Sequence, residues 1–267
     1  MSHLVWHQPK PDNKKNIIFS SCGNDSVALI QWAIDENLPN LHVAYSDTQW
    51  GSKDWPARVE KVKAWVEKNG GTFHTIQSEG FAELAKRKKA FPANGMAFCS
   101  YELKIKPAMD WLDNVDPEKK ATCLVGIMRL ESKARENWPV ILEASPNHGG
   151  RKLHSPLAKM EILDRDKLLA RSGFEKLETR SRECSPCVNA TINDLQKLPP
   201  QDVQKVHELE VVLGVGERSG KQKFMFRPHR MGGARGIHEV KKRADQGGGS
   251  YSPLQDDLFG CDSGFCG

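Results

Sequence analysis

A short polar stretch near the start of the chain combines residue types that bind phosphate. Residues 20–26 read Ser-Ser-Cys-Gly-Asn-Asp-Ser, between an apolar run at 16–20 that predicts a buried strand and a helical apolar pattern from Val27 onward. A strand that turns into a helix through small residues presents free backbone N–H groups at the helix N-terminus, and such groups bind phosphate. The stretch has neither a Walker A nor a Gly-x-Gly-x-x-Gly pattern, and an ordinary capped strand–turn–helix fits it equally well.

The cysteines indicate a second chemical centre. Cys184 and Cys187 form a Cys-x-x-Cys, which in a cytosolic chain is typical of a metal site or a redox dithiol, although chance spacing also explains two cysteines. We expect their partners to be Cys99 and the terminal pair, Cys261 and Cys266. A cytosolic chain of this kind is not expected to be held together by disulfides.

Cys99 has basic surroundings. It opens a predicted helix that carries Lys104 and Lys106, and a thiol near a helix N-terminus and lysines has a lowered pKa, as a metal ligand or a nucleophile requires. The alternative is a small core residue, which is the role we expect for Cys123 within an apolar strand.

Polar and charged residues follow two further predicted strands. Asp47 comes after a strand at 41–45, at the edge where parallel sheets bind ligands, although a turn or helix cap explains an Asp there nearly as well. Gly126, Arg129 and Arg135 follow another apolar strand, where two arginines can grip an anion bidentately. Surface arginines of a helix are the alternative for that pair.

The elements that must position these residues alternate between strand and helix. This order favours an α/β fold with a doubly wound parallel sheet. The expected strands are 16–20, 41–45, 72–76 and 121–127, and the expected helices are 27–37, 55–69 and 81–89. Further on we expect a loop at 148–157, an Asp-capped helix at 163–173 and a helix at 193–212.

The totals fit one large domain with appendages. The chain has 267 residues and a mild net charge of +5, and no apolar run approaches the ~18 residues that span a membrane. The first residues lack a signal pattern, so a cytoplasmic location is expected. We divide the chain into a nucleotide-binding domain, a helical and basic extension, and a flexible linker with a cysteine-containing tail, at residues 1–190, 191–246 and 247–267.

The extension contains a basic, glycine-rich segment. Residues 214–243 carry nine Lys and Arg side chains with Phe224 and Phe226 between them. This combination suits contact with nucleic acid through phosphates and stacking, and a flexible basic surface loop is the equally weighted alternative.

Taken together and in order, these motifs resemble the phosphoadenosine-phosphosulfate (PAPS) reductase family, within the adenine-nucleotide α-hydrolase (PP-loop) superfamily. The resemblance runs over about residues 16–189. Ser21 to Ser26 stands where the superfamily has Ser-Gly-Gly-x-Asp-Ser, and Asp47-Thr48 matches its second-strand Asp-Thr. The further matches are the segments at 99–107, 126–135, 155–157 and 184–187.

The sequence departs from the family pattern at positions that bear on which reaction is catalysed. Cys22 replaces a loop glycine, and Asn24 replaces the lysine that ATP-cleaving members often carry. Cys99 is single where cluster-bearing reductases have adjacent cysteines, and the Glu-Cys-Gly-Leu-His of assimilatory reductases is absent.

The resemblance implies a nucleotide-binding transferase or oxidoreductase that uses ATP, PAPS or adenylyl sulfate, with Mg²⁺ as an accompanying ion. The residues expected to bind the nucleotide are Ser20, Ser21, Cys22, Gly23, Asn24, Asp25, Ser26, Asp47 and Gly126. The residues expected to act in catalysis are Asp47, Lys104, Arg129, Arg135 and Cys266. A 4Fe–4S cluster is expected on Cys99, Cys184, Cys187 and one tail cysteine, Cys261.

Three functions compete on this basis. The preferred one is adenylylation or sulfur transfer in the modification of DNA or tRNA, with the nucleic acid held by Arg218 to Arg243. The alternative is a PAPS or adenylyl-sulfate reductase, in which a tail cysteine attacks the sulfur and thioredoxin resolves the product. The third is a non-catalytic protein that binds a nucleotide or nucleic acid. No membrane partner is expected.

Overall fold

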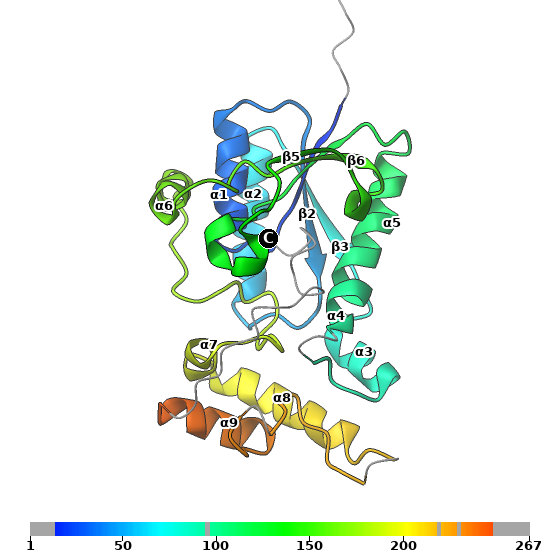
Figure 1. The fold of residues 1–267 in the computed structure, drawn as a ribbon, viewed down its shortest axis with the longest axis vertical. Helices are drawn as coiled ribbons and strands as arrows, with labels where there is room; N and C mark the ends of the chain where they lie inside the picture. Colours follow the sequence, from blue (N-terminus) through cyan, green and yellow to red (C-terminus); the bar gives the residue numbers. More distant parts are fainter. Residues whose placement is uncertain (1–13, 94–96, 218–219, 229–230, 248–267) are drawn as a thin grey trace, which may run out of the picture.

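The computed structural model describes residues 14–93, 97–217, 220–228 and 231–247. A six-stranded sheet is flanked by helices, and a group of helices lies below one end of it (Figure 1). The strands are β1 Asn16–Phe19, β2 Leu41–Asp47, β3 Thr72–Gln77, β4 Thr122–Leu124, β5 Ile141–Ser145 and β6 Arg151–His154. Their order is β3-β2-β1-β4-β6-β5, and every pair is parallel except β5 with β6. The predicted α/β class is therefore confirmed, with an added antiparallel edge.

Strand β1 lies inside the sheet, between β2 and β4, and its residues Ile17, Ile18 and Phe19 are buried. Asn16 pairs with Leu41 of β2 and with Thr122 of β4. Ile17 belongs to the apolar cluster on one face and Ile18 to the cluster on the other. An apolar run of this kind is what a fully covered parallel strand requires.

Helices cover the two faces of the sheet unequally. Helices α1 Asn24–Asp35, α2 Trp55–Lys68 and α6 Ile162–Arg171 contribute buried residues to one apolar cluster, and α5 Lys106–Val115 contributes to the other. Helix α1 begins three residues earlier than the apolar pattern predicts, so its first turn lies inside the polar stretch.

The predicted helix at Cys99 is present but irregular. Residues Phe98–Ser100 form α4, a π-helical turn follows at Tyr101–Ile105, and α5 continues from there. Leu103 and Lys104 of the π-turn are buried. Such turns occur frequently at functional sites.

The C-terminal helices pack on a third apolar cluster. The helix predicted at 193–212 is wrong as one element: α7 Ile192–Gln196 and α8 Pro200–Leu213 are separate, because Pro199 and Pro200 cannot continue a helix. Helix α9 Gly236–Asp245 lies beside them, and the cluster also includes residues of α3 Phe81–Lys88 and Trp50. No helix within the described residues is both long and apolar enough to cross a membrane.

Two other local predictions are corrected. The expected loop at 148–157 contains β6, because residues 152–154 pair with β4, and Arg151 at the start of this strand is fully buried. Helix α6 has Glu161 rather than an Asp at its N-cap, and no side chain caps it.

Candidate functional site

The polar stretch forms a tight loop between β1 and α1. Ser26 Oγ accepts the backbone N–H of Ser21 at 3.1 Å and lies 3.1 Å from the Ser21 hydroxyl. Cys22 N donates to Ser20 Oγ at 3.0 Å, and Gly23 N donates to Ser21 Oγ at 3.2 Å. The serines thus hold the loop closed, while the first N–H groups of the twelve-residue helix α1 have no partner within that helix.

Cys22 holds the one left-handed position of this loop. Its φ is +59°, a conformation that glycine adopts without strain, which gives a physical reason for a glycine at this place in related loops. Burial raises the pKa of the Cys22 thiol to about 12, and Arg58 Nε donates to the Cys22 carbonyl at 2.8 Å. Cys22 is therefore a neutral, buried part of the loop backbone rather than a reactive thiol.

A polar pocket opens above this loop. It encloses about 610 Å³ of empty space, part of it open to solvent. Gly126, just after β4, approaches the loop so closely that a Cβ there would lie 3.3 Å from the Asp25 carbonyl oxygen. The predicted residues that line the pocket are Ser21, Gly23, Asn24, Asp25, Gly126 and Arg135.

Asn24 holds a distant segment over the loop. Its Nδ2 donates to the Leu177 carbonyl and its Oδ1 accepts the Leu177 N–H, both at 2.9 Å. A Cβ on Gly23 would lie 2.9 Å from Ser181 Cβ, so the chain on both sides of Thr179 covers the loop. The Asn24 side chain is consequently occupied by the backbone, although its residue lines the pocket.

Two ion pairs border the pocket. Asp25 is paired with Arg165 of α6, and Glu131 is paired with Arg135. Burial and the negative charge of Asp25 raise the pKa of Glu131, although Arg135 opposes them. Arg135, one of the two predicted arginines, lines this pocket while its guanidinium is paired with Glu131.

Two other predicted residues face elsewhere. Asp47 ends β2, and its Oδ1 accepts the Gln49 N–H at 2.8 Å. Arg129 Nε donates to the Trp138 carbonyl at 2.8 Å. Neither residue lines the pocket above the loop or the thiol pocket, so their assignment to catalysis stays a prediction.

Cys99, Cys184 and Cys187 line a second pocket, which we call the thiol pocket. It encloses about 570 Å³ of empty space, part of it open to solvent. Lys104 lies in the same pocket and forms a buried ion pair with Glu183. Burial raises the pKa of the Cys184 thiol to about 12, and the Lys104 charge opposes this only in part.

The residues after β2 hold the Cys-x-x-Cys loop in place. Thr48 Oγ1 donates to the Glu183 carbonyl at 2.9 Å and lies 3.5 Å from Cys184 Sγ. Ser185 N donates to the Trp50 carbonyl at 2.9 Å. These contacts bring residue 184 to the carboxyl end of β2.

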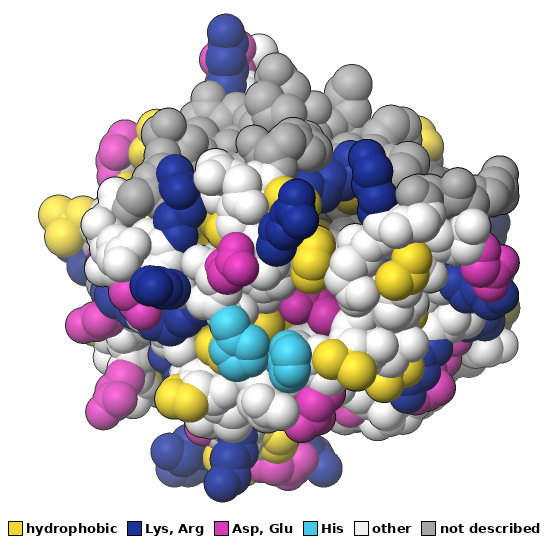
Figure 2. All heavy atoms as spheres, turned by 90° about the horizontal axis from the view of Figure 1, so that it is seen from below, with side chains coloured by type: hydrophobic (Ala, Val, Ile, Leu, Met, Phe, Trp, Pro, Cys, Tyr) yellow, Lys and Arg dark blue, Asp and Glu magenta, His cyan; other side chains and the backbone are white. Residues whose placement is uncertain are grey.

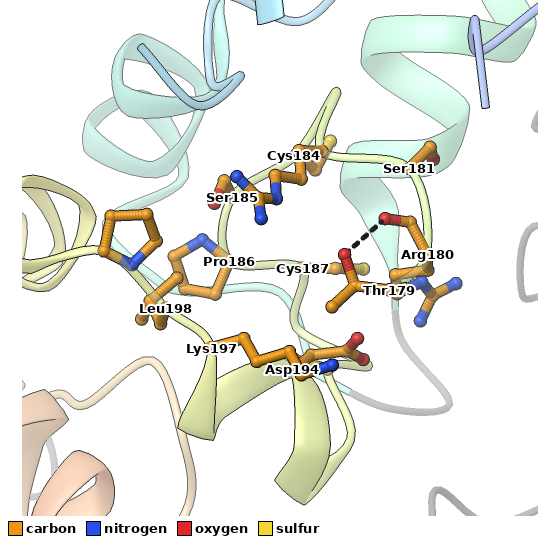
Figure 3. A pocket seen from close by; sticks show the side chains of 13 residues that line it. Thr179, Arg180, Ser181, Cys184, Ser185, Pro186, Cys187, Asp194, Lys197 and Leu198 are labelled. Atoms are coloured by element: carbon orange, nitrogen blue, oxygen red, sulfur yellow. Dashed lines mark hydrogen bonds between the residues drawn. The ribbon is translucent and has the colours of Figure 1, made fainter. Parts of the chain in front are cut away.

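A third pocket lies on the other side of the Cys-x-x-Cys loop. It encloses about 350 Å³ of empty space, part of it open to solvent. Figure 3 shows Ser185, Pro186 and Cys187 along one side of it, with Asp194 and Lys197 opposite. The Cys-x-x-Cys loop therefore forms a thin wall between two pockets.

The cysteines that the structure describes do not converge into a metal site. Within the part of the chain that the structure describes, no group of three or more His, Cys, Asp or Glu side chains converges so that it could hold a metal ion. Cys261 and Cys266 lie outside the described residues.

The described basic residues of the extension lie among residues of other kinds. Lys241 is paired with Asp245, and Lys223 Nζ donates to the Leu213 carbonyl. Figure 2 shows the face formed by α8 and α9, where Lys and Arg side chains are interspersed with acidic and apolar ones. Arg218 and Arg230 lie outside the described residues, so contact with nucleic acid stays a prediction.

Several residues of the two pockets are missed by sequence reasoning. Arg180 and Ser181 line both the pocket above the loop and the thiol pocket, and Thr48 and Glu183 hold the latter together. Glu183 precedes the Cys-x-x-Cys directly and Thr48 is the second residue of the Asp47-Thr48 match, so a motif marked both positions although neither was named as a site residue. No signal of this kind marks Arg180.

Comparison with known proteins gives a distant structural likeness. No protein-family model and no curated protein matches the chain. Among solved structures it is similar to a phosphoadenylyl-sulfate (PAPS) reductase from Candida auris, determined as a phosphate complex, at 14% sequence identity and a TM-score of 0.42. The match covers 61% of this chain and 74% of that one. Membership of the family stays a prediction from the motifs.

Proposed function

We propose that this protein is an adenine-nucleotide-dependent enzyme of sulfur chemistry. The observation that carries the proposal is the shared wall of two pockets. Arg180 and Ser181 line both the polar pocket above the β1–α1 loop and the thiol pocket. A nucleotide whose phosphate or sulfate enters the first pocket would therefore lie beside the cysteines of the second.

The polar pocket has the chemistry of an anion site. The N-terminus of α1 directs backbone N–H groups and the positive end of the helix dipole at it. Arg135 adds a guanidinium that can bind phosphate or sulfate oxygens bidentately. The Ser21 and Ser26 hydroxyls keep the loop in the shape that exposes those N–H groups.

The thiol pocket would serve the sulfur step. Cys99, Cys184 and Cys187 are of the ligand type that a 4Fe–4S cluster needs, and Lys104 would offset negative charge there. Three thiols are a suitable donor set for a cluster. Their arrangement in the described structure does not suit one, because the three side chains do not converge on one point. The proposal accordingly contains no step that passes through a cluster.

Product analysis tests the proposal and separates its versions. Purified protein is incubated with PAPS or adenylyl sulfate and reduced thioredoxin, and separately with ATP in the presence or absence of DNA or tRNA. Sulfite release supports the reductase. Pyrophosphate that appears only with nucleic acid supports the finer proposal of adenylylation or sulfur transfer in nucleic-acid modification. Binding of none of these nucleotides by calorimetry would contradict the proposal in every version.

Anaerobic purification addresses the cluster separately. An absorbance spectrum with iron and sulfide analysis is compared between the unmodified chain and a Cys184→Ser, Cys187→Ser variant. Iron and sulfide that disappear in the variant would support a cluster on this loop. Iron-free, colourless protein would remove the cluster and leave the thiols themselves as the reactive groups.

A further inference from the structure

A set of buried polar contacts joins the Cys-x-x-Cys loop to helix α8. Ser185, between the two cysteines, donates its hydroxyl proton to Asp202 Oδ2 at 2.6 Å. Ser185 is 4% exposed and Asp202 is 2% exposed, so this hydrogen bond to a carboxylate is shielded from water. Lys205 lies one turn further along α8, with its Nζ 3.4 Å from Asp202 Oδ1.

Lys205 also reaches the segment that follows β2. Its Nζ donates to the carbonyls of Trp50 at 3.2 Å and of Gly51 at 3.1 Å. The same ammonium lies 4.4 Å from the centroid of the Trp50 ring, which is within the range of a cation–π interaction. Lys205 therefore fixes both the backbone and the side chain of Trp50.

Trp50 in turn forms hydrogen bonds with the Cys-x-x-Cys loop. Its carbonyl accepts the Ser185 N–H at 2.9 Å, and its indole Nε1 donates to the Pro186 carbonyl at 3.2 Å. Trp50 and Cys184 also form an isolated parallel bridge. The loop is held from one side by Trp50 and from the other by Asp202, and Lys205 contacts both.

We propose that Asp202 and Lys205 are positioning residues that hold Cys184 and Cys187 in the wall of the thiol pocket. The inference rests on the proposed function, which assigns a sulfur step to the thiols of this pocket. The contacts themselves are independent of that chemistry. Because they act on the two residues between the cysteines, their loss is expected to move these thiols and to leave the distant cysteines in place.

Site-specific alkylation of the full chain tests this inference. The purified protein is treated with iodoacetamide without nucleotide, and the rate at each cysteine is followed by peptide mass spectrometry. In Ser185→Ala the rates at Cys184 and Cys187 are expected to rise about tenfold, the change that corresponds to losing one hydrogen bond to a charged group. Lys205→Met, which keeps the aliphatic stem over Trp50, is expected to act in the same direction.

Internal and matched controls distinguish positioning from general loosening. Cys22 and Cys123 are fully buried in the sheet region, and their alkylation is expected to remain unchanged. Ser185→Thr keeps a hydroxyl for Asp202 and is expected to restore the original rates. Gln204→Met, at an exposed neighbouring position of α8, is expected to have no effect.

Two results would overturn the inference. One is an equal rise at Cys22, Cys123, Cys184 and Cys187, which indicates a loss of overall stability. The other is an unchanged rate at Cys184 and Cys187 in both Ser185→Ala and Lys205→Met. The alkylation experiment contains no nucleotide, so its result does not depend on enzymatic activity. If product analysis detected no activity, the proposed function would be contradicted, but the inference about Asp202 and Lys205 would still be tested by alkylation.

Discussion

The side chain of Asn24 forms two hydrogen bonds with the backbone of Leu177, each 2.9 Å long, across 153 residues of sequence. This pair joins the first turn of α1 to the segment that contains Arg180. The same segment separates the pocket above the loop from the thiol pocket. Asn24 thus links the β1–α1 loop to the segment that lines both pockets.

Replacing Asn24 is expected to release that segment. Asn24→Ala removes both hydrogen bonds, and we expect the free energy of unfolding to fall by about 1–2 kcal/mol. Asn24→Lys can donate to the Leu177 carbonyl but cannot accept its N–H, so a smaller loss is expected. Urea unfolding measures the change, and limited proteolysis after Arg180 reports the local release.

The exposed Asn137 supplies the comparison for this experiment, because its side chain contacts only the neighbouring Glu136. Asn137→Ala is expected to leave stability and cleavage unchanged. If Asn24→Ala behaved in the same way, the two hydrogen bonds would not hold the segment.

The central sheet was predictable because its signals are local. The runs around Ile18 and Val43 are apolar over a strand's length, and the polar stretch between β1 and α1 follows directly in the sequence. Parallel strands bring their carboxyl ends to one edge, and Asp25 and Gly126, both expected to bind the nucleotide, each follow one of these strands. A Cβ on Gly126 would lie 3.3 Å from the Asp25 carbonyl oxygen, so the two residues lie close together.

The rest depends on contacts between distant residues. Arg151 is fully buried and ion-paired with Asp116, so its strand has a charged residue where a local pattern predicts a loop. Leu177 meets Asn24 through its backbone, which no side-chain pattern reveals. Prolines 199 and 200 were readable as a helix boundary, because proline lacks the N–H that a helix interior needs.

The buried His148 is expected to make stability depend on pH. Burial, with the nearby positive charge of Arg151, lowers the pKa of His148 to about 4 from its usual 6.5. The folded protein therefore keeps this imidazole neutral while the unfolded chain protonates it. Stability from this source is complete above pH 6.5 and is lost as the pH falls toward 4, by about 3 kcal/mol in total.

Unfolding by urea at several pH values measures that loss. His148→Gln removes the titrating group, so the decline between pH 6.5 and 4 is expected to be shallower in the variant. His42 and His74 also have lowered pKa values and remain in both proteins, which makes the difference between the two curves the relevant quantity. Parallel curves would show that His148 is not held neutral.

Arg135 is expected to determine anion affinity. Arg135→Met removes a guanidinium from the pocket above the loop, and we expect the affinity for adenylyl sulfate to fall about 10- to 100-fold. Glu131→Gln removes a negative charge from the same pocket and is expected to strengthen binding. Calorimetric titration measures both changes.

An ion pair between an arginine and an aspartate away from the pocket supplies the control for charge. Arg171, exposed and paired with Asp35, lies away from the pocket lining, and Arg171→Met is expected to bind as the unmodified protein does. Equal losses in Arg135→Met and Arg171→Met would mean that overall charge, rather than the pocket, sets the affinity.

Variants of the buried ion pair between Lys104 and Glu183 can show whether Lys104 has a structural or a catalytic role. Both side chains are less than one tenth exposed, so Lys104→Met takes the ammonium away from a buried carboxylate. We expect the free energy of unfolding to fall by about 3–5 kcal/mol, and the double variant Lys104→Met, Glu183→Gln to recover most of it. Lys106→Met, at an exposed pair with Asp110, is expected to change stability by less than about 1 kcal/mol.

Activity of the refolded double variant then decides the role of Lys104. If Lys104 neutralises charge during the sulfur step, the double variant folds and binds nucleotide but forms no product, because its pocket lacks the ammonium. If Lys104 serves only to pair with Glu183, the double variant keeps both its stability and its turnover. Urea unfolding, calorimetry and product analysis on the same four proteins distinguish the outcomes, and full turnover by the double variant would contradict a catalytic role.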